Sequence, residues 1–136
     1  MSSMLLEIVT PERKIYGQEV NMVVAKGIEG ELGILPNHIP MVTPLRIAAV
    51  VAKVQGQKDH VVAVHGGFME VRKDKVVILA ESAELPEEID ADRAARARER
   101  AEARLREAKK EKVDFHRAEQ ALARAMLRIN VRNRDI

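Results

Sequence analysis

Arginine is the residue type whose number and spacing could do chemistry in this chain. Between residues 93 and 106, one arginine follows another every two to four positions. A guanidinium is always charged and pairs with phosphate or carboxylate oxygens through parallel hydrogen bonds. The run therefore predicts a surface that binds an anionic partner, although such a run is also typical of a solvated helix face. Its members are Arg93, Arg96, Arg98, Arg100, Arg104 and Arg106.

Residues that usually serve enzymes are sparse and scattered. Cysteine is absent, which excludes thiolate nucleophiles and thiolate metal sites. The histidines at positions 38, 60, 65 and 116 are not spaced as metal ligands, and none of the three serines lies in a nucleophile motif. The glycines at 27, 30 and 33 are followed by no helical pattern, so we interpret them as turn residues rather than a dinucleotide loop. We expect a protein that is not an enzyme and has no metal site.

The elements that must position these side chains change character near Pro86. Before it, short β-branched runs are separated by glycine, proline and other turn residues. Many short strands at fairly regular spacing are typical of a β-sandwich or barrel. The predicted strands cover residues 5–9, 20–25, 30–36, 47–54, 61–65, 68–71 and 76–80.

No glycine or proline follows Pro86, and the periodicity becomes helical. Apolar residues recur three or four apart at 94, 97, 101, 105 and 108, and again at 115, 118, 122, 125 and 129. These stripes, separated by a polar break at 109–113, predict an antiparallel two-helix hairpin. Because the stripes are mostly alanine, their seam buries little area, and the hairpin could change partners. The expected fold is α+β in two parts, with an all-β sandwich at 1–86 and the hairpin at 87–136.

The net charge of +2 is unevenly divided between these parts. Residues 1–90 hold nine Lys or Arg and thirteen Asp or Glu, a net of −4, whereas residues 91–136 hold fourteen and eight, a net of +6. The basic part favours an acidic partner, and a nucleic-acid-binding module is one alternative. Against it, Tyr16, Phe68 and Phe115 are too few to stack bases. No run of about 18 apolar residues predicts a membrane span.

Two motifs are more specific than these patterns. Residues 30–40 read G-E-L-G-I-L-P-N-H-I-P, with G-G-F-M-E-V following at 66–71, and residues 89–94 read I-D-A-D-R-A. In this order and spacing they closely resemble the ε subunit of bacterial F-type ATP synthases, over nearly the whole chain. The resemblance implies a sandwich of about ten strands followed by a two-helix hairpin, in a non-catalytic subunit of the central stalk.

The same resemblance implies partners. The β part would bind the γ subunit and rest on the ring of c subunits, with Glu31 and His38 in the loop that faces the ring. Taken alone, Glu31 is also explained as a solvated turn residue and His38 as a loop packing residue. The hairpin would fold down, or extend along γ into the α3β3 catalytic head, where the six arginines would meet an acidic segment and inhibit ATP hydrolysis. The complex would hold the chain peripherally on the cytoplasmic side of the cell membrane.

The I-D-A-D-R-A motif resembles the ATP-binding motif found in ε subunits of bacilli. The resemblance implies that ATP is bound without hydrolysis and favours the folded-down hairpin. Asp90 is also explained as a helix N-cap, and Asp92 would repel phosphate if it faced the same way. Whether Mg²⁺ accompanies the nucleotide stays open. The implied ATP-binding residues are Glu84, Ile89, Asp90, Arg93, Ala94, Arg100, Arg124 and Arg128.

Overall fold

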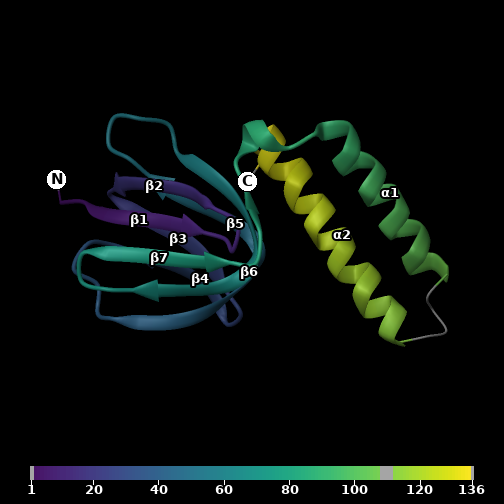
Figure 1. Ribbon diagram of the computed structural model, residues 1–136, viewed down its shortest axis with the longest axis horizontal. Coiled ribbons are helices and arrows are strands. Elements are labelled where there is room, and N and C mark those ends of the chain that lie inside the picture. The colour runs from purple at the N-terminus through teal and green to yellow at the C-terminus, as the bar shows by residue number, and fades with distance from the viewer. Residues whose placement is uncertain (1, 108–111, 136) are drawn as a thin grey trace. The chain divides into compact units, whose positions relative to one another are not determined.

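The computed structural model describes residues 2–107 and 112–135 of the chain. It divides into two compact units, and the division falls between Leu85 and Pro86. The first unit contains eight strands, and the second contains a 3₁₀ turn and two helices (Figure 1). The strands are β1 (Met4–Val9), β2 (Lys14–Val20), β3 (Met22–Gly27), β4 (Gly30–Ile34), β5 (Met41–Lys53), β6 (His60–Val71), β7 (Lys75–Ala80) and β8 (Ala83–Glu84). The helical elements are η1 (Pro86–Glu88), α1 (Ala91–Glu107) and α2 (Lys112–Asn133).

The strands form one sheet in the order β2-β1-β7-β6-β5-β3-β4, with β8 paired to β6. The β1–β7 pair is parallel, and the other pairs are antiparallel. Buried residues from all eight strands, such as Leu6, Val23, Val64 and Ile78, belong to one hydrophobic cluster. A flat sheet could not bring these residues together, so the sheet folds over its own core as a sandwich. The predicted β-sandwich and two-helix architecture is confirmed.

The described residues contain eight strands where about ten were expected, because two of the strands are unusually long. β5 and β6 pair along most of their length, from Met41 with Val71 to Ala52 with His60. The first half of β6 pairs with β8 and its second half with β7. The predicted break at Gly66-Gly67 is therefore a bend inside one strand. Both glycines have positive φ, 80° and 127°, which lets the strand turn without ending.

Strand β2 was not predicted, apart from its last residue, Val20. Among the described residues, this strand pairs only with β1 and buries Ile15 and Val20, while its remaining residues are mostly polar or small. A strand at a sheet edge can be stabilised by ladder hydrogen bonds and two core contacts, so its hydrophobic signal is weak.

In the helical unit, four alanines of the predicted stripes are buried, whereas Ala97 and Leu105 are half-buried and Phe115 is exposed. Ala94 and Ala101 of α1 and Ala118 and Ala125 of α2 are all at most 3% exposed. Helix α2 begins at Lys112, inside the segment predicted as the break, and residues 108–111 lie outside the described residues. At its other end α2 stops with Arg134 at φ 55°, a left-handed C-terminal conformation.

Candidate functional site

The six arginines of α1 do not form a single face. Successive residues of an α-helix turn by about 100°, so Arg93, Arg96, Arg100 and Arg104 lie within roughly a quarter of a turn of one another. Arg98 and Arg106 point from other sides of the same helix. All six are exposed. The expected six-residue basic face is thus corrected to a four-residue flank, because the 3.6-residue period separates the remaining two from it.

Helix α2 carries a matching flank. The pair Arg-Ala occurs three times in α1 and twice in α2. In two pairs of each helix, seven residues apart, the alanine is buried, whereas Ala97 of the third pair in α1 is half-buried. In both helices the arginine therefore lies about 100° around the helix axis from the buried alanine, and the direction of this rotation is the same in both. Two antiparallel helices that face each other through these alanines present their arginine flanks on the same side of the hairpin. The pairs with a buried alanine are Arg93-Ala94, Arg100-Ala101, Arg117-Ala118 and Arg124-Ala125, and Arg128 lies one turn beyond Arg124.

We call this side of the hairpin the arginine side. It unites four of the sequence-predicted ATP-binding residues: Arg93, Arg100, Arg124 and Arg128. Arg93 and Arg100 are exposed, and Arg124 and Arg128 are half-buried. Guanidinium groups from two neighbouring helices suit a ligand with several anionic oxygens, because each group can pair with a different oxygen.

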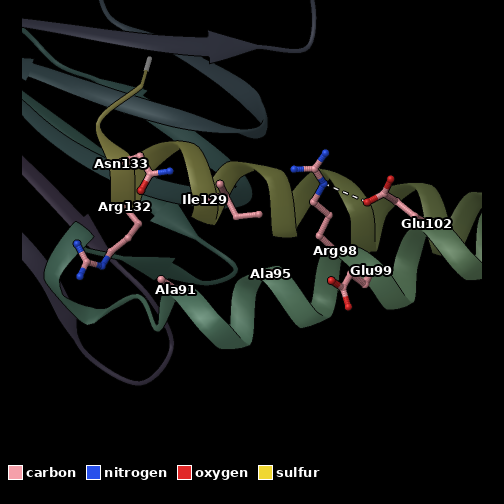
Figure 2. Close-up of a pocket in the computed structure, with 8 residues that line it drawn as sticks. All are labelled: Ala91, Ala95, Arg98, Glu99, Glu102, Ile129, Arg132 and Asn133. Carbon is pink, nitrogen blue, oxygen red and sulfur yellow. Dashed lines mark hydrogen bonds and ion pairs between the residues drawn. The ribbon is translucent and has the colours of Figure 1, made fainter.

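The opposite side of the hairpin holds a groove of about 450 Å³ (Figure 2). Arg98 lies there, and its Nε donates to Glu102 Oε1 at 3.0 Å. The lining contains two arginines and two glutamates, so its formal charge is balanced. This groove is therefore less suited to a polyanion than the arginine side. Its lining residues are Ala91, Ala95, Arg98, Glu99, Glu102, Ile129, Arg132 and Asn133.

Asp90 serves as the N-cap of α1. Its Oδ1 accepts a hydrogen bond from the backbone N–H of Arg93 at 3.0 Å, and its carbonyl accepts from Ala94 N–H at 3.0 Å. The cap satisfies one of the free donors of the first helical turn. Ile89, just before it, is buried and 4% exposed. The structural explanation for Asp90 holds, and any contact with a nucleotide would come in addition to it.

Glu84 lies in β8 and is fixed by a residue that the sequence did not single out. His65 of β6 donates from Nε2 to Glu84 Oε1 at 2.9 Å. The two side chains are diagonal neighbours, since Glu84 pairs in register with Ala63, two residues before His65. A histidine beside a glycine pair gave no signal in the sequence. Only the β6–β8 pairing, which rests on a two-residue strand, reveals the contact.

Glu31 and His38 occupy different elements. Glu31 is exposed in strand β4, opposite Lys26 of β3, so the expectation that it lies in a loop is wrong. The pairing of β4 with β3 extends as far as the turn between these strands and therefore includes Glu31. His38 lies in the loop after β4, where its Nδ1 donates to the carbonyl of Ile39 at 2.6 Å. That loop is anchored by Asn37, whose N–H donates to Lys73 O at 2.9 Å from a left-handed conformation at φ 70°.

Two further properties of the described residues concern the class of site. Within residues 2–107 and 112–135, no group of three or more His, Asp or Glu side chains is arranged to hold a metal ion. In the same part of the chain, neither helix combines the length and apolar character that crossing a membrane requires.

Both parts of the chain match known family models. Residues 3–86 match the β-sandwich domain of the ATP synthase delta/epsilon chain, and residues 87–133 match the long α-helix domain of the same chain. The ATP synthase epsilon chain of Halalkalibacterium halodurans is 54% identical over 134 residues, which cover 98% of this chain and 100% of that protein. The epsilon chain of Brevibacillus brevis is 60% identical over 107 residues, covering 79% and 81%.

A solved structure is similar to most of this chain. It is a chain in a cryo-EM structure of the mitochondrial ATP synthase of Euglena gracilis, comprising OSCP, F1 and the c-ring. The TM-score is 0.79 at 25% identity, and the match covers 93% of this chain and 79% of that one. The chain belongs to the delta/epsilon family of ATP synthase subunits, and within it to the ε chains of bacterial F-type enzymes.

Proposed function

We propose that the chain is a non-catalytic rotor subunit in the central stalk of a proton-translocating F-type ATP synthase. The main support for this proposal is that the two family models together cover residues 3–133 and that each corresponds to one of the two compact units. In this role the sandwich links the γ subunit to the c-ring. The chain is then held at the membrane through the complex, peripherally and on the cytoplasmic side.

The sandwich contacts the c-ring through Glu31 and His38 in this proposal. Glu31 is exposed on β4, and His38 lies in a loop held by a backbone hydrogen bond to Lys73. Charged and polar groups of this kind suit the polar loops of a ring subunit. The test is co-purification of the c-ring with the chain and γ. Glu31→Ala together with His38→Ala should weaken recovery of the ring while γ remains bound.

In this proposal the hairpin inhibits ATP hydrolysis. When extended along γ it presents the α1 flank of Arg93, Arg96, Arg100 and Arg104 to an acidic segment of the catalytic head, where charge complementarity favours docking. Truncation after Leu85 keeps the sandwich unit and removes the helical unit. ATPase activity of the assembled complex should then rise. Unchanged hydrolysis after truncation would refute the inhibitory role.

ATP is the regulatory ligand in this proposal, bound without hydrolysis and favouring the folded-down hairpin. The arginine side supports it, because four guanidinium groups there suit the phosphates. Glu84, Ile89, Asp90 and Ala94 complete the set by family resemblance. The charged cap at Asp90 also sets the start of α1, whose N-terminal end mildly favours anions.

Titration calorimetry of the full chain with ATP tests this ligand. Saturable binding is expected, weakened about tenfold by Arg100→Ala or Arg124→Ala, the loss typical of one charge-assisted hydrogen bond. Arg98→Ala is the matched control, since it removes the same side chain from the opposite side of the hairpin. Equal losses in all three variants would mean a general charge effect and would reject the site. Titrations with and without Mg²⁺ would establish whether the ion takes part.

A further inference from the structure

His65 is a buried polar residue of β6. It follows the core residue Val64 and therefore lies on the opposite face of the strand. It is 3% exposed, and its backbone N–H donates to Ser82 O at 2.9 Å while its ring donates to Glu84. Both bonds join β6 to the segment around β8, one through the main chain and one through the side chain. The backbone hydrogen bond thus fixes the position of the His65 main chain, and the bond from the ring fixes the position of the Glu84 carboxylate.

The partner decides which ring nitrogen carries the proton. A carboxylate oxygen accepts in this bond, so Nε2 must donate. His65 Nδ1 is buried, and no partner for it exists among the residues that the structure describes. An aliphatic side chain would fill this position without a buried unpaired polar atom. Packing alone therefore does not account for an imidazole here, whereas the bond to Glu84 does.

We propose that His65 is a positioning residue, which holds the Glu84 carboxylate in the orientation that receives the nucleotide. The proposal rests on the proposed function, in which Glu84 belongs to the ATP site. A carboxylate repels phosphate, so Glu84 faces the nucleoside part of the ligand and accepts from an amino or hydroxyl group there. A carboxylate accepts several hydrogen bonds, so the bond from His65 is compatible with one from the ligand.

The experiment compares two amide substitutions at one position in the full chain. In His65→Gln the amide nitrogen reaches about as far as Nε2, so the donor to Glu84 is kept. In His65→Asn the amide nitrogen reaches only as far as Nδ1, so the donor is lost. ATP affinity measured by calorimetry should stay within about twofold for the first and fall about tenfold for the second, the loss expected for one hydrogen bond to a charged group. Circular dichroism of each variant verifies folding.

Two controls separate positioning from general damage. His60→Gln changes another histidine of β6, whose ring bonds to Tyr16 and Gln57, and it should leave ATP affinity unchanged. In a Glu84→Ala background, His65→Asn should cause no further loss of affinity, because the residue acts only through the carboxylate. Such non-additivity identifies residues that act as a unit.

The outcomes distinguish this inference from the function on which it rests. If the unaltered chain fails to bind ATP at millimolar concentration, the nucleotide site is refuted and the role of His65 with it. If the unaltered chain binds ATP and His65→Asn binds equally well, only the role of His65 is refuted. Additive losses in the double variant would likewise overturn the positioning role and leave the ATP site standing.

Discussion

Gly67→Ala perturbs the bend that lets β6 take part in both layers of the sandwich. Gly67 pairs with Leu45 of β5 and with Ala80 of β7. Its φ of 127° is a conformation that other residues rarely adopt. A Cβ added there would lie 2.9 Å from the Cα of Ala80 and would also collide with the carbonyl oxygen of Leu79. Both obstacles are backbone atoms, so no side-chain rotation relieves them.

The expected cost has two parts. Holding alanine at this φ costs of order 1–3 kcal/mol, and displacing the packed β7 backbone costs about 1–3 kcal/mol more. The free energy of unfolding should therefore fall by about 4 kcal/mol, a large part of the roughly 5–15 kcal/mol typical of a domain. Gly56→Ala is the matched control, because Gly56 also has a positive φ, 78°, but a Cβ there meets nothing within 4 Å. Its cost should be about 1 kcal/mol.

Urea denaturation followed by tyrosine fluorescence measures this difference. The chain has one tyrosine and no tryptophan, and Tyr16 lies in β2, so the signal reports unfolding of the sandwich. The midpoint for Gly67→Ala should lie well below that for Gly56→Ala, with the slope unchanged. If the two variants lose stability within about 1 kcal/mol of each other, the argument from close backbone approach is refuted.

Two further predictions concern charged groups. Hydrogen bonds from Lys14 and then Lys75, at 2.7 and 2.6 Å, lower the pKa of Glu7 from 4.5 to about 2. Because the folded-state pKa is depressed, the stability from Glu7 is present above pH 4.5 and is lost as the pH falls towards 2. Denaturant melts of the chain and of Glu7→Gln should differ at pH 6 and converge near pH 2; a pH-independent difference would contradict this account. Asp90→Ala should lower helical stability by about 1 kcal/mol through loss of the cap to Arg93, whereas Asp90→Asn keeps a capping oxygen. Thermal melts at 222 nm test this, and equal melts for both variants would count against the cap.

The local elements were largely predictable, and the exceptions have physical causes. Hydrophobic alternation located most of the sandwich strands, and the alanine spacing located both helices, because each pattern follows from the geometry of a single element. Most of β2 was not predicted, because an edge strand with two buried residues has little hydrophobic periodicity. The glycine pair at 66–67 predicts a break between strands, because a bend within a strand and a turn between strands need the same residues.

The candidate site was predictable only in part. The arginine run and the Asp90 cap follow from neighbouring residues, and the cap bond to Arg93 is present. The helical period then decides which arginines act together, and it separates Arg98 from the flank that contains Arg93 and Arg100. The family resemblance supplied Glu84, but nothing in the sequence pointed to His65 as its partner.

Sequence patterns alone predict the division near Pro86, the two kinds of periodicity, the uneven charge and the family. These properties depend on residues close together in the chain, where backbone geometry is fixed by a few neighbours. Two contacts between distant elements emerge from the folded structure. Arg93 and Arg100 of α1 share a side of the hairpin with Arg124 of α2, and His65 bonds to Glu84, 19 residues away. Such contacts depend on how distant elements pack and pair, and no local pattern encodes the direction from which a partner arrives.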